Sequence, residues 1–392
     1  MSASEKYIAI YRRFRPETFD TVLGQEHIIR VLKNQINTGN LGHAYLFTGT
    51  RGTGKTTMAR LLAKGVNCQA GGGGEVPETA DIRPCGVCSA CNEIKNGTYI
   101  DVVEIDAASN NSVDDVRDLR DSIIYPPAMG RKKVYIIDEV HMFSKGAFNA
   151  LLKTLEEPPD HVLFILCTTE SNKLPQTILS RCIKFDFKRV SQDEIARGMK
   201  DICNEMGVSI ADDAVALLAR SADGSVRDGL SLLEQCVTSG VGGGGSDGGG
   251  GSGAGGGEIT RDLVLEILGS PSDEDVAGLT ADAAAGRTGE ALVRLAEMIS
   301  AGREDRRIIE DWIDYFHSAL LIKFVKNPGR IINRSAENID MIRAQAEDYD
   351  VNFINNSIYR LSKLLNDSRW SPHTRILLEM AVIDISEIAG KK

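Results

Sequence analysis

Gly49-Thr50-Arg51-Gly52-Thr53-Gly54-Lys55-Thr56 has the spacing of a phosphate-binding loop, a glycine followed by four residues and then Gly-Lys-Thr. The apolar run 44–47 precedes it and the helical stretch 57–64, beginning at Thr57, follows it, so the order is strand, loop, helix. Its glycines let backbone amides converge on phosphates at the helix N-terminus. Lys55 adds a charge for the β- and γ-phosphates, and the Thr56 hydroxyl is placed to ligate Mg²⁺. A plain glycine-rich turn is the weaker alternative.

A second acidic motif indicates what happens to the bound nucleotide. The apolar stretch 134–137 ends in Asp138-Glu139, at the strand edge where open α/β sheets bind ligands. Asp138 would hold the Mg²⁺ hydration shell, and Glu139 would polarise a water for attack on the γ-phosphate. The pair predicts a hydrolase rather than a phosphotransferase, against the alternative of two solvated acids at a strand end.

The order of apolar runs predicts an α/β domain with a parallel five-stranded sheet, followed by helical domains. The expected strands are 45–48, 101–105, 133–137, 162–168 and 183–187, and all of them except 101–105 are apolar enough to be covered on both faces. Helical periodicity begins near residue 191 and defines a small domain over 191–241. Residues 258–392 are helical throughout, with apolar stripes typical of a bundle core. Between these, residues 242–257 contain 12 glycines in 16 positions, a flexible linker that is either natural or rebuilt.

Four cysteines have the spacing of a structural metal site. Cys85, Cys88 and Cys91 are three residues apart, and Cys68 lies upstream as a fourth ligand. Four thiolates around one ion favour structural zinc, with an iron–sulfur cluster or a redox pair as the alternatives. The other four cysteines lie in apolar contexts and are expected to be buried thiols; they are Cys167, Cys182, Cys203 and Cys236.

Composition excludes several classes of protein. The 392 residues are 42% hydrophobic and 26% charged, which is typical of an ordinary globular chain. The longest apolar run is far below the ~18 residues of a membrane span, and the N-terminus lacks the pattern of a secretory signal. We therefore expect a reducing cytoplasm. Residues 1–190 carry a net charge of +2, from 24 Lys and Arg against 22 Asp and Glu, within a total of −10. Any polyanion would contact this first half.

Taken together, the motifs resemble AAA+ ATPases and, more closely, the gamma/tau family of bacterial DNA polymerase III clamp loader subunits. The likeness is dense over residues 7–236 and general beyond them. Besides the two motifs above, it rests on Tyr11-Arg12-Arg13-Phe14-Arg15-Pro16-Glu17-Thr18-Phe19, Gly24-Gln25-Glu26-His27, Leu151-Leu152-Lys153-Thr154-Leu155-Glu156-Glu157-Pro158-Pro159, Ser180-Arg181-Cys182 and Gly224-Ser225-Val226-Arg227-Asp228.

The resemblance implies roles that spacing alone does not assign. Thr169, with Thr168 as the neighbouring candidate, resembles sensor 1, which reads the γ-phosphate or the attacking water. Arg227 resembles sensor 2 of the lid domain 191–241, and Arg181 resembles the arginine finger that acts on ATP held by the adjacent subunit. Tyr11 and Arg12, in the segment 11–18, and the segment 24–27 resemble the adenine-contacting region. The family also carries a zinc module where this chain has its cysteine cluster, although the loop from Cys68 to Cys85 is longer than usual.

The implied function is an ATPase subunit that loads the sliding clamp on primed DNA. The implied partners are delta and delta-prime type subunits, further copies of the chain, the clamp and the backbone of primer-template DNA, with residues 258–392 as an oligomerisation collar. Asn110, Asn111 and Ser112 occupy the family's DNA-contacting position, where a capped helix start is an equal alternative. A non-catalytic scaffold and another AAA+ machine, such as a branch-migration motor, are the competing functions; the intact phosphate loop and Asp138-Glu139 argue against the scaffold.

Overall fold

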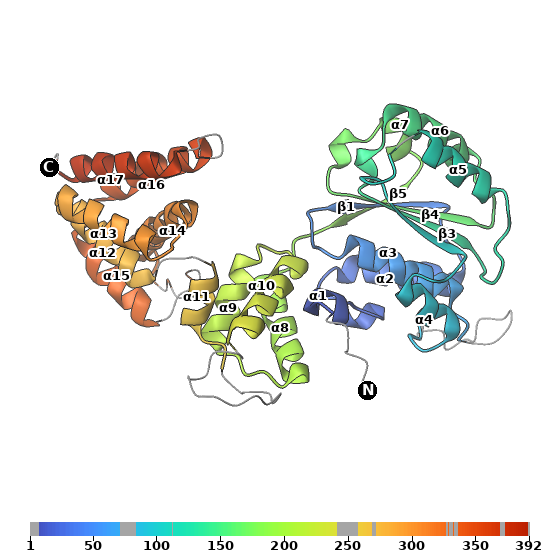
Figure 1. Ribbon diagram of the computed structural model, residues 1–392, viewed down its shortest axis with the longest axis horizontal. Helices are drawn as coiled ribbons and strands as arrows, with labels where there is room; N and C mark the ends of the chain where they lie inside the picture. The colour runs from blue at the N-terminus through green and yellow to red at the C-terminus, as the bar shows by residue number, and fades with distance from the viewer. Residues whose placement is uncertain are drawn as a thin grey trace, which may run out of the picture. The chain divides into compact units, whose positions relative to one another are not determined.

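The computed structural model describes residues 8–70, 84–111, 113–240, 258–268, 272–326, 328, 332, 336–368 and 373–390. It divides into two compact units (Figure 1). The first comprises residues up to Gly207 together with Leu218–Glu234, and the second comprises Val208–Leu217 together with the residues from Gln235 onward. Within the described residues, no helix is long and apolar enough to cross a membrane.

The first unit contains a five-stranded parallel sheet with the order β2-β3-β4-β1-β5. The strands are β1 (Ala44–Gly49), β2 (Val102–Asp106), β3 (Lys133–Asp138), β4 (Val162–Thr168) and β5 (Ile183–Phe187). This confirms the expected fold class, and each strand lies within one residue of its predicted range.

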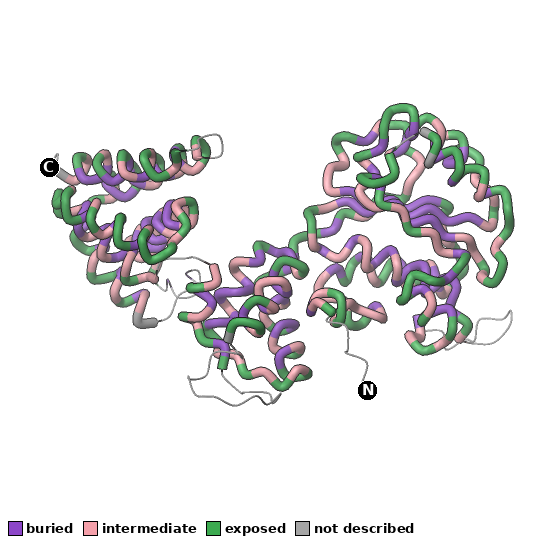
Figure 2. Tube along the Cα trace, in the orientation of Figure 1, coloured by how far each residue is buried: buried purple, intermediate pink, exposed green. Residues whose placement is uncertain are grey.

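Helices cover both faces of the sheet (Figure 1). The helices α2 (Glu26–Thr38) and α3 (Lys55–Asn67) pack on one face, and α5 (Val113–Ile123), α6 (Lys145–Glu156) and α7 (Gln176–Leu179) pack on the other. This part of the chain also contains α1 (Ile10–Arg13), α4 (Ser89–Asn96) and the short 3₁₀ turns η1 (Phe19–Thr21), η2 (Val140–Met142) and η3 (Ser171–Lys173). Successive residues of β1 alternate between faces: Tyr45 and Phe47 pack with α2 and α3, whereas Leu46 packs with α5 and α6. Figure 2 shows β1, β3 and β4 as the buried centre of this unit.

Two expectations about burial are corrected. The edge strand β5 is not covered on both faces, because Ile183 is 40% exposed and Lys184 and Asp186 are exposed. Its sequence alternates apolar and polar residues, which is the pattern of a strand with one face in solvent. Cys182, expected to be buried, is half-buried, whereas Cys167, Cys203 and Cys236 are buried.

All remaining elements are helical. They are α8 (Gln192–Met206), α9 (Asp212–Ser221), α10 (Val226–Gly240), α11 (Arg261–Leu268), α12 (Asp273–Ala284), α13 (Thr288–Ser300), α14 (Asp305–Phe324), α15 (Ala336–Asp348), α16 (Val351–Asp367) and α17 (Thr374–Gly390). A capping box fixes the start of α8, where Ser191 Oγ accepts from Glu194 N and the Glu194 carboxylate accepts from Ser191 N. The predicted glycine linker 242–257 lies outside the described residues.

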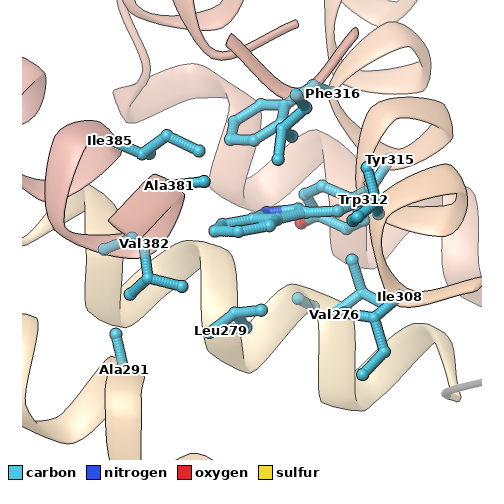
Figure 3. Close-up of a cluster of buried hydrophobic side chains, with 14 of the residues drawn as sticks. Val276, Leu279, Ala291, Ile308, Trp312, Tyr315, Phe316, Ala381, Val382 and Ile385 are labelled. Atoms are coloured by element: carbon cyan, nitrogen blue, oxygen red, sulfur yellow. The ribbon is translucent and has the colours of Figure 1, made fainter. Parts of the chain in front are cut away.

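The predicted apolar stripes of the C-terminal part form the core of the second unit. Trp312 is fully buried, and Figure 3 shows its ring between Leu279 of α12 and Phe316 of α14. The indole N–H donates to Thr280 Oγ1 over 2.9 Å, so the one polar atom of this side chain is satisfied inside the core. The stripe therefore contributes packing, as expected, and contains no cluster of catalytic side chains among the described residues.

Candidate active site and metal centre

The phosphate loop joins β1 to α3, and its backbone is held in a tight turn by three glycines and one side-chain contact. Gly49, Gly52 and Gly54 have φ angles of 146°, 75° and 96°, conformations that side-chain-bearing residues rarely adopt. Thr53 Oγ1 closes the turn by donating to Thr50 O over 2.8 Å. The predicted loop residues are therefore arranged so that backbone amides converge at the N-terminus of α3.

Lys55 points back into its own loop. Its Nζ donates to Gly49 O over 2.9 Å and to Thr50 O over 2.8 Å, and the residue is only 6% exposed. Burial lowers the pKa of Lys55, while the charges of Glu139 and Asp138 partly offset that effect. Because its partners are neutral carbonyls, the ammonium is available to a phosphate that enters the loop.

Thr56 and Asp138 bring two oxygens together at the Mg²⁺ position predicted from sequence. Thr56 Oγ1 donates to Asp138 Oδ2 over 2.7 Å, which links the first turn of α3 to the end of β3. The second oxygen, Asp138 Oδ1, accepts from Glu139 N over 3.0 Å. A hydroxyl and a carboxylate are the hard oxygen ligands that Mg²⁺ prefers, so this pair fits that ion.

Glu139 lies in a strained turn beside this pair. Its φ angle is 46°, which is rare for a residue with a side chain. Its Oε2 accepts from Thr169 Oγ1 over 3.0 Å and from Thr169 N over 3.2 Å. The neighbouring candidate, Thr168, is buried and contacts His141 Nδ1 at 3.0 Å instead. Of the two threonines, Thr169 is the one that contacts the acidic group.

The phosphate loop lines a cavity of about 750 Å³ within the first unit, which is the size of a typical small-ligand pocket. Thr168 and Thr169 are not among its lining residues. Of the predicted loop residues, 51–57 line it, whereas Gly49 and Thr50 act through the carbonyls that hold Lys55. Asp138, Glu139 and Arg227 also line it.

Only some of the residues expected to contact adenine line the cavity. Tyr11 lines it, and the Arg227 guanidinium lies 5.0 Å from the centre of the Tyr11 ring. Arg12 stands 5.8 Å from the same ring and is not a lining residue. The guanidinium of Arg12, and then that of Arg227, lower the pKa of Tyr11. The segment 24–27 does not line the cavity, because Gln25 is used to bind both backbone polar groups of Lys188.

Sequence reasoning missed the wall that α8 provides. The cavity is lined from that helix by Gly198, Asp201, Ile202 and Glu205, and Leu23 also lines it. Gly198 lies inside a helical pattern, and a glycine in that position often marks a site of close packing, so it is the sequence signal that points to this wall. A Cβ on Gly198 would lie 2.5 Å from Leu23 Cδ1.

Arg181 does not line the cavity of its own chain. Its side chain is 33% exposed, with Nη2 2.7 Å from Glu156 Oε1 and Nη1 donating to Thr177 O over 2.8 Å. The predicted finger is thus a partly exposed guanidinium held on α6 and α7, and its role stays a prediction.

The predicted DNA contacts are also untested. Asn110 Nδ2 donates to Asp106 O over 3.1 Å, so this amide helps to close the turn after β2, and Asn111 is exposed. Ser112 lies outside the described residues. Asp106 and Asp114 nearby are both exposed acids, which weaken any attraction for phosphate.

The four cysteines predicted as metal ligands converge. The sulfurs of Cys68, Cys85, Cys88 and Cys91 all lie within 4.8 Å of one another. Cys88 N donates to Cys85 Sγ and Cys91 N donates to Cys88 Sγ, each over 3.4 Å, and such N–H donors stabilise thiolates. The site joins the end of α3 to α4, and four sulfurs, the only ligand atoms grouped here among the described residues, fit tetrahedral zinc.

Three family models match successive parts of the chain. Residues 24–191 match the DNA polymerase III delta subunit, residues 194–242 match the ATPase lid domain of the DNA polymerase III clamp loader subunit, and residues 259–390 match domain III of DNA polymerase III subunits gamma and tau.

Two curated relatives and one solved structure are similar to this chain to different extents. The DNA polymerase III subunit tau of Bacillus subtilis is 40% identical over 97% of this chain, which spans 63% of that relative's length. The subunit gamma of Buchnera aphidicola subsp. Schizaphis graminum is 36% identical, over 85% of this chain and 88% of the relative. Among solved structures, the RuvB Holliday junction branch migration motor of Thermotoga maritima is 20% identical, with a TM-score of 0.47 over 69% of this chain and 78% of the other.

Proposed function

The chain belongs to the gamma/tau family of DNA polymerase III subunits, and on that basis we propose that it is an ATPase subunit of a bacterial replicative clamp loader. In this role it couples ATP binding and hydrolysis to loading of the sliding clamp on primed DNA. The observation that carries the proposal is the single cavity in which the phosphate loop, the Thr56–Asp138 pair and Glu139 meet.

The geometry supports hydrolysis at this cavity. The loop amides and Lys55 would hold the β- and γ-phosphates, and Thr56 and Asp138 would hold Mg²⁺, which when bound neutralises charge on those phosphates. Glu139 would take a proton from a water whose oxygen attacks the γ-phosphorus, as the bond to the β-γ bridging oxygen breaks and ADP leaves. Thr169 fixes Glu139 Oε2, so Oε1 is the oxygen left to accept that proton.

The remaining predictions form part of the same proposal. We propose an AAA+ domain over 1–190, a lid over 191–241, a linker over 242–257 and a collar over 258–392. The proposal also includes structural zinc at the four cysteines. The chain would assemble in the cytoplasm with delta and delta-prime type subunits and further copies of itself, and it would contact the backbone of primer-template DNA. Arg181 would act on ATP bound by a neighbouring subunit, and Arg227 would couple the lid to the nucleotide.

ATP turnover by the assembled complex tests the proposal. We expect the steady-state ATPase rate to rise when the sliding clamp and primed DNA are both added, and Lys55→Ala to abolish that turnover. A non-catalytic scaffold would instead give no turnover in the wild type and an isolated chain that does not bind ATP. A rate indifferent to clamp and DNA would contradict the clamp loader function while leaving an ATPase.

A further inference from the structure

His141 lies in the turn that follows Glu139, and its side chain contacts the segment at the end of β4 that carries Thr168 and Thr169. It belongs to η2, just after β3, and its side chain is 6% exposed. Its Nδ1 is 3.0 Å from Thr168 Oγ1 and 3.4 Å from Glu139 Oε2, and its Nε2 is 3.4 Å from Glu170 Oε1. Both ring nitrogens therefore face oxygens. Thr168 is the last residue of β4, Glu139 directly follows the neighbouring strand β3, and Glu170 lies two residues beyond β4.

The Thr168–Thr169 pair ties Glu139 to the end of β4 by two routes. Thr169 donates directly to Glu139 Oε2 through its hydroxyl and its amide. Thr168 Oγ1 accepts from Glu170 N over 3.0 Å and contacts the imidazole, which in turn stands beside the same Glu139 oxygen. His141 is thus the indirect link between Thr168 and Glu139.

The backbone at Glu139 requires such support. Its positive φ angle is unfavourable for a residue with a side chain and persists only where surrounding contacts impose it. The turn is closed by Met142 N, which donates to Glu139 O over 2.8 Å, so His141 is one of the two residues inside that turn. An imidazole anchored to β4 therefore restrains the same turn that aims the Glu139 carboxylate.

We propose that His141 is a positioning residue for Glu139. Its ring holds the η2 turn against Thr168 and Glu170, which keeps Oε2 at Thr169 and leaves Oε1 for the attacking water. Glu170 extends the contact outward, because it pairs with Lys173 at 2.8 Å and that pairing lowers the pKa of Glu170. This inference rests on the proposed function and deepens it, since it concerns the group that would accept the proton.

Three substitutions in the assembled complex separate positioning from packing. In place of His141, asparagine puts an amide near the position of the imidazole Nδ1, glutamine puts one near the position of Nε2, and alanine removes both. We expect His141→Ala to slow single-turnover ATP hydrolysis by about 10- to 100-fold, since misplacement of a catalytic group by about 1 Å has effects of this size. The Kd for ATP should stay within about twofold, because the phosphate loop is untouched. His141→Asn should recover most of the rate and His141→Gln should not.

A matched control and a structural readout complete the test. His161 lies just before β4, with Nε2 3.1 Å from Ile123 O, so His161→Asn removes an imidazole from the opposite end of that strand and should leave hydrolysis unchanged. A crystal structure of His141→Ala should show the Glu139 carboxylate displaced from Thr169. Unchanged hydrolysis or an undisplaced carboxylate in His141→Ala would overturn the role, as would a His141→Asn variant as slow as His141→Ala. If the wild-type complex hydrolyses no ATP, the proposed function fails, and the position of the carboxylate in that crystal structure still decides the role of His141.

Discussion

Gly52 is a position where backbone conformation and packing both require glycine. Its φ angle is +75°, and a Cβ there would lie 1.9 Å from Ser225 Oγ and 3.0 Å from Ser225 Cβ. Ser225 cannot simply rotate away, because its Oγ accepts from Asp228 N over 3.2 Å in the first turn of α10. A side chain at residue 52 would therefore strain the phosphate loop and disturb the start of a helix.

We expect Gly52→Ala to weaken ATP binding at least tenfold and to lower the free energy of unfolding by about 2–4 kcal/mol, the sum of backbone strain and a lost cap. Titration with a fluorescent ATP analogue and thermal unfolding measure the two effects. Gly97→Ala is the matched control, because Gly97 has a φ angle of +72° with open space around it, and only the backbone cost of about 1 kcal/mol applies. Wild-type affinity in Gly52→Ala would contradict the close approach.

Local spacing predicts the residues that the structure gathers around the cavity, and it does not predict the residues that support them. Lys55, Thr56 and Asp138 belong to motifs whose spacing encodes their chemistry. Ser225 packs against Gly52 although the two residues are more than 170 positions apart in the sequence. Asp201 lines the cavity because tertiary packing places its helix there. Such contacts are set by tertiary structure, which a pattern in a single sequence does not record.

At the scale of elements, one buried carboxylate organises the connection between α5 and β3. Asp101 is 2% exposed and accepts from the backbone N–H groups of Ala128, Met129 and Gly130, each over 2.7 Å. Burial by itself raises the pKa of Asp101, but the three N–H donors, together with the charge of Lys133, outweigh that effect and hold this pKa below its usual value. The charged form is thus the one that the loop requires.

Asp101→Asn should lower the free energy of opening of the β2–β3 ladder at neutral pH by about 2–4 kcal/mol, since the amide turns an N–H group toward other donors. A carboxyl with a depressed pKa stabilises the fold above its unfolded pKa and loses that contribution as pH falls through the folded value. The difference between wild type and variant should therefore shrink below about pH 4. Hydrogen exchange of the ladder amides measures this difference.

Asp121→Asn is the control for Asp101, because the Asp121 side chain is 64% exposed and pairs with the adjacent Arg120. It should change stability by no more than about 0.5 kcal/mol. An Asp101 variant that behaves like this control would show that the three N–H contacts do not hold the loop.

Zinc removal tests the link between α3 and α4. We expect one zinc per chain by mass spectrometry in the wild type and in Cys182→Ser, whose half-buried thiol lies outside the cluster. Cys88→Ser should lose the tightly bound ion, and a strong chelator should speed proteolysis between residues 84 and 97, because metal binding stabilises such small modules by ~10 kcal/mol or more. Zinc retained in Cys88→Ser, or iron in its place, would refute the site as described.

At the scale of the whole molecule, the predicted finger Arg181 stands apart from the cavity of its own chain. Arg181 is absent from the cavity lining and pairs with Glu156 instead. If it acts on a neighbour, complexes carrying Arg181→Ala should bind ATP normally and hydrolyse it roughly 10³-fold more slowly. Arg306→Ala, which removes an exposed guanidinium paired with Glu310 in the second unit, should leave the rate unchanged. Lost nucleotide binding in Arg181→Ala would assign that residue to its own pocket.

The most direct measurement compares ATP binding and single-turnover hydrolysis in assembled complexes that carry wild-type chain or Glu139→Gln. Glutamine keeps the shape of the side chain and removes the group that accepts the proton from water. The Kd for ATP should be preserved and hydrolysis should fall by at least about 10²-fold, so that the complex retains uncleaved ATP. Hydrolysis at the wild-type rate in Glu139→Gln would contradict the assignment of this cavity as the site where the chain hydrolyses ATP.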